Sequence, residues 1–214
     1  MIKYFTNKTK FWKTAERSIK KTDVVLDIGC GIRPQKYFKP KVHILCEPYY
    51  EYIQELQKQK GYSNRIILML KWNEVLKCLP EKSVDTIFLM DVIEHLPKKT
   101  GEKLLKKSLK IARKQIVIFT PLGFVKQHHE DGIDAWGFKG AKWQEHRSGW
   151  TPSNFSSDWA FFVHKNFHSQ ILINGKQFKP EHGAFFAINS LRNPSLTIMQ
   201  RIMEWLKNIQ RIIK

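Results

Sequence analysis

The sequence predicts an α/β fold with a doubly wound, mostly parallel sheet, on three observations. First, the apolar run at 24–28 has no helical spacing and is followed by Gly29 and Gly31. This pattern is typical of a buried parallel strand that ends in a glycine loop. Second, a similar apolar run occupies 42–46. Third, segments typical of strands and of helices alternate as far as residue 121, which is the pattern of a doubly wound sheet.

The N-terminal segment at 4–21 predicts an amphipathic helix. Its apolar residues recur at helical intervals among lysines: Phe5, Phe11, Trp12, Ala15 and Ile19. Such a helix either covers the pocket at the glycine loop or packs on the sheet as an ordinary helix, and the second interpretation is favoured. After the loop, Pro34 and Pro40 limit any helix to a turn or two.

The next elements continue the alternation. A helix is expected at 51–60, ended by Gly61, and a strand is expected at 65–70. A loop at 80–83 leads into the following strand. A lysine-rich helix then runs from Pro97 to about residue 114, with leucines and Ile111 facing inward.

After residue 121 the character of the sequence changes. Residues 123–159 are dense in Gly, His, Asp, Trp and Lys and show little periodicity, so we expect a long loop over the carboxyl ends of the strands. Long ordered loops at that edge commonly form substrate sites. Two last strands are expected at 160–163 and 183–188, joined through the hairpin pair Asn174-Gly175.

The tail at 195–214 carries an apolar stripe on one helical face, with its basic residues mostly elsewhere. The stripe consists of Leu196, Met199, Ile202, Met203, Leu206, Ile209 and Ile213. Such a stripe has three interpretations: it docks on its own domain, it forms the interface of a homodimer, or it lies on an anionic bilayer. Packing or dimerisation is favoured. We therefore divide the chain into a domain at 1–194, which includes the N-terminal helix and the loop at 123–159, and a basic amphipathic helix at 195–214.

The chain has 214 residues and a formal net charge of +18. Much of the excess is lysine on the solvated face expected for the helix that follows Pro97, which fits either solubility or attraction to an acidic substrate or an anionic membrane. No nucleic-acid motif is present, and the aromatic residues are not interleaved with the basic run, which disfavours nucleic acid. The N-terminus lacks the apolar core of a signal peptide. We expect a cytoplasmic protein, with peripheral contact to the inner face of the membrane as the alternative.

Two residues indicate which cofactor the glycine loop favours. Asp27, two residues before Gly29, would repel a pyrophosphate but attract the ammonium and sulfonium cations of S-adenosylmethionine. Pro34 stands where a dinucleotide site has its third glycine, which again disfavours a close pyrophosphate. About twenty residues beyond Asp27, Glu47 stands where such folds place the carboxylate that binds a ribose diol. Here the chain resembles the class I S-adenosylmethionine-dependent methyltransferases, whose first motif usually reads Asp-x-Gly-x-Gly.

The resemblance extends over most of the chain. Residues 86–96 look like the family's fourth strand and the segment after it, and 116–121 look like its fifth strand. Asn73, beside Trp72, stands where the family usually has an acid that contacts the adenine amino group, and its carbonyl can still accept that hydrogen bond. A further departure is Arg33, which stands where a third glycine is frequent.

The family's features imply a Rossmann-like fold that closes its sheet with an antiparallel strand, and S-adenosyl-L-methionine as the cofactor. They also imply a set of cofactor-binding residues: Asp27, Gly29, Cys30, Gly31, Glu47, Pro48, Trp72, Asn73, Asp91 and Val92. Gly-Ile-Arg-Pro-Gln at 31–35 and His-Arg-Ser-Gly-Trp at 146–150 are similar to segments of methyltransferases from bacterial polysaccharide pathways.

Two histidines are the candidate catalytic residues. Transfer of a methyl group to a hydroxyl is helped by a base, and histidine is suited to that role near neutral pH. His95 follows the fourth strand, and His146 lies in the long loop. For each, the competing interpretation is a structural role in the loop.

Two other features of the long loop have weaker functional interpretations. A polar cluster at 128–131, His-His-Glu-Asp, could bind a divalent metal, but adjacent histidines rarely reach one ion, so we expect no metal. Trp136, Trp143, Trp150 and Trp159 either pack on a sugar ring or planar acceptor or wedge the loop onto the core.

Together these observations predict a methyltransferase that uses S-adenosylmethionine on a small-molecule or glycan-linked hydroxyl, with an acidic or lipid-phosphate carrier as one option. Three alternatives remain open. One is N-methylation of a small molecule or RNA. The second is nicotinamide-dependent reduction, which Asp27 and Pro34 disfavour. The third is a non-catalytic interaction module that keeps the fold.

Overall fold

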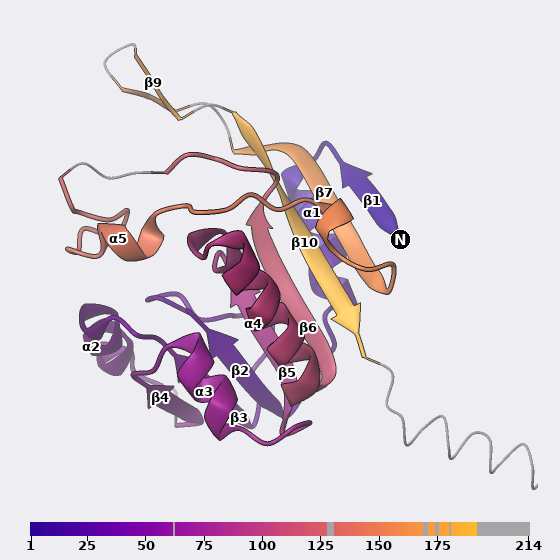
Figure 1. Cartoon of the computed structure of the whole chain (residues 1–214), viewed down its shortest axis with the longest axis vertical. Coiled ribbons are helices and arrows are strands. Elements are labelled where there is room, and N and C mark those ends of the chain that lie inside the picture. Colours follow the sequence, from indigo (N-terminus) through magenta and orange to yellow (C-terminus); the bar gives the residue numbers. More distant parts are fainter. Residues whose placement is uncertain (62, 128–130, 169–170, 174–175, 180, 192–214) are drawn as a thin grey trace, which may run out of the picture.

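The computed structural model describes residues 1–61, 63–127, 131–168, 171–173, 176–179 and 181–191. Within these ranges an eight-stranded sheet forms the centre of the molecule (Figure 1). In sheet order its strands are β1 (Ile2–Phe5), β7 (Trp159–His168), β10 (His182–Ser190), β6 (Ala112–Pro121), β5 (Val84–Met90), β2 (Val24–Ile28), β3 (Val42–Cys46) and β4 (Arg65–Leu68). Strand β10 is antiparallel to both of its neighbours, and the other pairs are parallel. The prediction of a doubly wound, mostly parallel sheet with an antiparallel last strand is confirmed.

Helices cover both faces of the sheet (Figure 1). They are α1 (Lys8–Ser18), α2 (Tyr50–Lys58), α3 (Trp72–Cys78) and α4 (Lys98–Ile111), with the single turns η1 (Ile93–His95), α5 (Ala141–Gln144) and η2 (Pro152–Asn154). None of the described helices is both long and apolar enough to cross a membrane.

The central strands are buried on both faces because their side chains alternate between two apolar layers. Leu26 of β2 and Ile87 of β5 pack in a cluster with Leu104 of α4. The next residue along β5, Phe88, points to the opposite face and packs in a second cluster with Phe11 of α1. This continuous burial explains why these strands lack the polar alternation of a one-sided sheet.

The N-terminal prediction was wrong in part. The segment expected as one helix at 4–21 begins as strand β1, which adds to the edge of the sheet by pairing with β7, and the helix α1 starts only at Lys8. Asn7 caps that helix by accepting a hydrogen bond from the backbone N–H of Lys10 (2.8 Å). The N-terminal extension is therefore a strand and a helix.

Several other boundaries also differ from the prediction. Strand β4 ends at Leu68, and helix α4 ends at Ile111, where β6 begins at once. Residues 72–78, which had no element assigned, form helix α3. Between β7 and β10 the chain forms an additional antiparallel pair, β8 (Ile171–Ile173) and β9 (Lys176–Lys179). The predicted turn at 174–175, between these strands, and the tail at 195–214 lie outside the described residues.

Candidate functional site

The glycine loop after β2 is held against the end of β3. Gly29 and Gly31 have positive φ angles of 62° and 53°, a conformation that glycine adopts readily. The backbone N–H of Gly29 donates to the carbonyl of Cys46 (2.7 Å), and that of Gly31 donates to Glu47 Oε2 (2.9 Å). The carboxyl group of Glu47 thus points to the loop, and its role in binding a ribose stays a prediction.

The carboxyl group of Glu47 lies in an unusual environment because the residue is only 4% exposed. This burial raises its pKa from 4.5 to about 7, although hydrogen bonds from the backbone N–H groups of Tyr49 and Gly31 counteract part of the rise. Near neutral pH the group is consequently balanced between its acid and carboxylate forms.

A first cavity of about 200 Å³ opens beside this loop, at the carboxyl ends of the parallel strands. Seven of the predicted cofactor-binding residues line it: Gly29, Gly31, Glu47, Pro48, Trp72, Asp91 and Val92. It is also lined by residues that the sequence did not single out for this role, among them Tyr52, Lys71, Leu96 and Gln144. The cavity lies where ligands bind in doubly wound sheets.

The other three predicted residues do not line the first cavity. Asp27 is buried, and its Oδ2 accepts a hydrogen bond from the backbone N–H of Gln35 (2.7 Å) and lies 3.4 Å from His43 Nε2. Cys30 lines a neighbouring cavity, and Asn73 is exposed in the first turn of α3. The structure therefore places Trp72 at the cavity without bringing Asn73 to it.

The second cavity, of about 410 Å³, adjoins the first. The two share five lining residues: Gly29, Asp91, His95, Trp136 and Gln144. Glu94 and His146 also line the second cavity. Both predicted catalytic histidines therefore reach one cavity, although they are about fifty residues apart in the chain.

Two carboxyl groups stand at the junction of the cavities. Asp91 directly follows β5 with a positive φ of 52°, and its side chain is exposed to both cavities. Glu94, which is 2% exposed, accepts a hydrogen bond from Thr120 Oγ1 (2.9 Å). Loss of solvent raises the pKa of both side chains. The neighbouring Glu94 raises that of Asp91 further, whereas hydrogen bonds from the backbone, Thr120 and Asp91 counteract part of the rise for Glu94.

The two histidines are anchored in the same way. Nδ1 of His95 lies 3.2 Å from the carbonyl of Glu145, and Nδ1 of His146 lies 2.6 Å from the carbonyl of Val125. Their ring centroids are 5.1 Å apart. Burial lowers the pKa of His95, which favours its neutral form.

The segment at 147–150 clamps η1 in place. The backbone N–H groups of Arg147 and Ser148 both donate to the carbonyl of Glu94, at 2.7 and 3.0 Å. The Ser148 hydroxyl and Trp150 Nε1 donate to the carbonyl of Ile93, at 3.2 and 3.1 Å. The His-Arg-Ser-Gly-Trp segment therefore fixes the turn that carries Glu94 and His95 while it supplies His146 itself.

The loop at 123–159 also closes over the glycine loop. Tyr52 of α2 donates from its hydroxyl to Asp134 and accepts a hydrogen bond from Gln144 Nε2 (3.0 Å). The ring of Trp136 lies so close to Gly31 that a Cβ there would be 2.3 Å from it. Trp136 and Trp143 line the first cavity, whereas Trp150 and Trp159 pack in the core. Trp150 and Trp159 thus have the packing role considered for them, whereas a role of Trp136 and Trp143 in binding a sugar or planar acceptor stays a prediction.

Several solved structures have a fold similar to this one. The chain matches a protein described as an S-adenosylmethionine-dependent methyltransferase from Listeria monocytogenes with a TM-score of 0.51 and 9% identity, over 87% of this chain and all of that one. A protein described as a methyltransferase from Bacillus halodurans matches at 0.55 and 10%, over 84% of this chain and 96% of that one. The chain has a methyltransferase fold.

A third match at this level of similarity is the YcgJ protein from Bacillus subtilis, with a TM-score of 0.57 and 11% identity, over 87% of this chain and all of that one. No family model and no curated protein matches the sequence. At such low identity the methyltransferase fold is what these similarities establish.

Proposed function

We propose that the protein is an S-adenosylmethionine-dependent methyltransferase that acts on a hydroxyl group of a small molecule or glycan. The observation that supports this most strongly is the joining of the two cavities. The first has a glycine loop and the buried carboxylate of Glu47, which suit an adenosine ribose, and the second has a group of titratable side chains that suit an acceptor.

The geometry suits methyl transfer because this reaction mainly requires two molecules to be held in line without water. The cofactor would occupy the first cavity with its sulfonium near Asp91, where the positive charge would favour ionisation of that carboxyl group against the effects that raise its pKa. An acceptor in the second cavity would then meet the methyl group at the residues shared by the two cavities. Trp136 and Gln144, which line both, would exclude water from that junction.

His95 and His146 are the groups available to remove the hydroxyl proton. The Nδ1 contact of each ring with a backbone carbonyl requires the proton on Nδ1, which leaves a lone pair on Nε2. A neutral imidazole of this tautomer can accept a proton near neutral pH. The acceptor hydroxyl rather than an amine is favoured by this supply of bases, since a neutral amine needs none.

Calorimetry and thermal unfolding test the cofactor. S-adenosylhomocysteine at a hundred times its Kd should raise the Tm by about 5 to 10 °C, whereas NADH should not. Glu47→Ala should abolish most of this rise in Tm. The control Glu81→Ala removes an exposed carboxylate that lines neither cavity, and the rise in Tm should be the same as in the wild type. Equal shifts with NADH would favour the nicotinamide alternative, and no shift with either ligand would favour a non-catalytic module. Transfer of a labelled methyl group to a panel of saccharide and phenolic hydroxyls would then identify the acceptor.

A further inference from the structure

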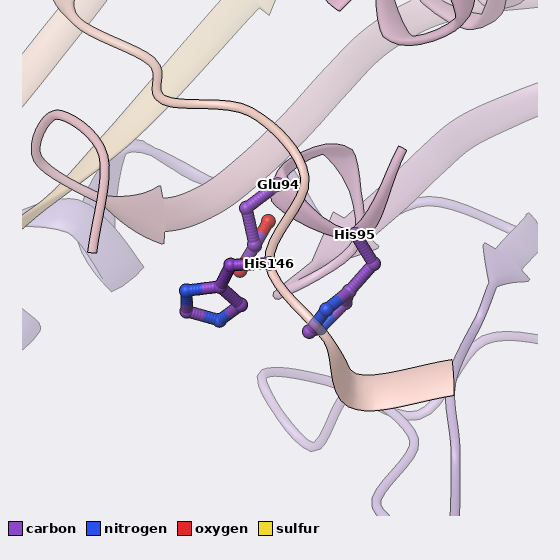
Figure 2. A group of neighbouring side chains, drawn as sticks. All are labelled: Glu94, His95 and His146. Carbon is purple, nitrogen blue, oxygen red and sulfur yellow. The ribbon is translucent and has the colours of Figure 1, made fainter. Parts of the chain in front are cut away.

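Three side chains at the second cavity converge on one point. Glu94 and His95 come from η1, and His146 comes from the loop segment that crosses it (Figure 2). One ligand atom from each, a carboxylate oxygen or an imidazole nitrogen, lies within 4.8 Å of the other two. Two imidazoles and one carboxylate form a donor set that binds divalent first-row cations and leaves coordination positions open.

The hydrogen bonds of the two histidines orient them for this role. Backbone carbonyls only accept, so the rings of His95 and His146 carry their protons on Nδ1 and direct the lone pair of Nε2 elsewhere. Histidines that bind metals typically donate their other ring N–H to a carbonyl or carboxylate in this manner. Two such histidines in one cavity, tied to separate carbonyls of the same loop, indicate a preorganised pair.

The carboxylate supplies the second, independent observation. Glu94 Oε2 accepts from Thr120, but Oε1 is buried and accepts no hydrogen bond from an ordinary donor among the residues that the structure describes. The neighbouring side chain is that of Asp91, and two carboxyl groups can hydrogen-bond only when one of them is protonated. A buried carboxylate oxygen without a partner is strongly destabilising. Asp91 adds another carboxylate beside it at the same cavity, and a cation would compensate both.

We propose that Glu94, His95 and His146 bind one divalent first-row cation, such as Mn²⁺ or Zn²⁺, and that this cation holds the acceptor through its hydroxyl oxygen. The two imidazoles favour such a cation over Mg²⁺, which prefers oxygen ligands. The role in holding the acceptor rests on the proposed function, whereas cation binding itself does not. With the ion bound, the Nε2 lone pairs of His95 and His146 coordinate it and cannot also accept the hydroxyl proton. The ion would replace the histidines in this step, because a hydroxyl bound to it loses its proton to solvent more easily. An acceptor with two neighbouring oxygens would chelate the ion.

Wild-type protein without added cofactor provides the first test. Titration with Mn²⁺, followed by electron paramagnetic resonance, should show one bound ion per chain. In a nuclear magnetic resonance spectrum the ring signals of His95 and His146 should broaden first. His43 and His164 line neither cavity and serve as internal controls whose signals should broaden later.

Single substitutions provide the second test. Glu94→Gln, His95→Asn and His146→Asn should each weaken Mn²⁺ binding by at least about tenfold. Glu102→Gln removes an exposed carboxylate from α4 and should leave the Kd unchanged. Thermal unfolding of each variant shows whether it is folded. If a variant does not fold, the broadening of the histidine signals in the wild-type protein still tests the proposal.

Two results would overturn the proposal. One is wild-type protein that binds neither Mn²⁺ nor Zn²⁺ more tightly than the Glu94→Gln variant. The other is early broadening of His43 or His164 in place of His95 and His146. If S-adenosylhomocysteine still binds in these cases, the methyltransferase proposal stands without the metal. Conversely, metal binding without cofactor binding would contradict the proposed function and leave the cation site intact.

Discussion

Raising the pH from 6 to 8 should strengthen the binding of S-adenosylhomocysteine because it ionises Glu47. The pKa of this buried group is about 7, so about a tenth of the molecules carry the carboxylate at pH 6 and about nine tenths carry it at pH 8. A carboxylate accepts charge-assisted hydrogen bonds from both hydroxyls of a ribose, and the protonated acid does so more weakly. The Kd should therefore fall by up to about tenfold, or about 1.4 kcal/mol.

The stability of the ligand-free protein should change in the opposite direction. Because folding raises the pKa of Glu47 from 4.5 to about 7, the folded state favours the protonated acid. Its contribution to stability is present below about pH 4.5 and is lost as the pH rises through about 7, by at most about 3 kcal/mol. Opposite trends of affinity and stability distinguish ionisation of Glu47 from general damage by pH.

Calorimetric titration of S-adenosylhomocysteine at pH 6, 7 and 8, with thermal unfolding of the free protein at each pH, measures both trends. The control is Glu47→Gln, which keeps the shape and an acceptor oxygen but cannot ionise. Asp91 and Glu94 are present in both proteins, so any pH dependence from them remains in the control. If wild type and variant show the same slope of Kd with pH, Glu47 is not the group that binds the ribose.

Two further predictions concern packing around the site. Gly101→Ala should destabilise the fold by about 1 to 2 kcal/mol in urea unfolding, because its Cβ would lie 2.5 Å from the buried ring of Trp150 and such overpacking outweighs the helix propensity gained. A more stable variant would show that the ring moves aside freely. Tyr52→Phe should cost about 1 to 2 kcal/mol and speed proteolysis within 123–159, because Asp134 and Gln144 lose their common partner. Unchanged proteolysis would show that Tyr52 does not hold the loop closed.

Strands buried on both faces could be located from the sequence. Val24–Ile28 and Val42–Cys46 were predicted with their observed boundaries because each is a short, mostly apolar run without helical spacing, interrupted only by Asp27 in the first and His43 in the second. Strand β1 was missed because it is a mostly exposed edge strand whose Phe5 also fits the spacing of the helix that follows. The end of α4 was misplaced because Ala112 starts β6 without a glycine or proline to mark the change.

The site was predictable only where it is local in sequence. The glycine loop and Glu47 could be found because strand, turn and acid follow one another at a regular spacing. The closing contact of Tyr52 with Asp134, and the approach of His146 to Glu94, join residues far apart in the chain. In each pair one residue belongs to the loop at 123–159, which has no periodic pattern from which its position could be predicted. The sequence suggested a metal-binding group only at 128–131 and disfavoured it there because adjacent histidines rarely reach one ion, so no metal was expected. Residues 128–130 lie outside the described part of the chain.

The turn η1 connects the two cavities. The hydrogen bonds that hold it, from the segment at 147–150, should therefore affect the methyl-transfer step more than the affinity for the cofactor. Asp91 and Val92, just before the turn, line the first cavity, and Glu94 lines the second. The backbone of the turn is held by the N–H groups of Arg147 and Ser148, so its position is fixed by the loop that also carries His146. A small shift of this turn would displace Glu94 and His95 at the second cavity, where the acceptor is proposed to bind. It would leave Glu47 and the glycine loop unchanged. Because transfer depends steeply on the alignment of the two reactants, weakening the clamp should lower turnover more than cofactor binding.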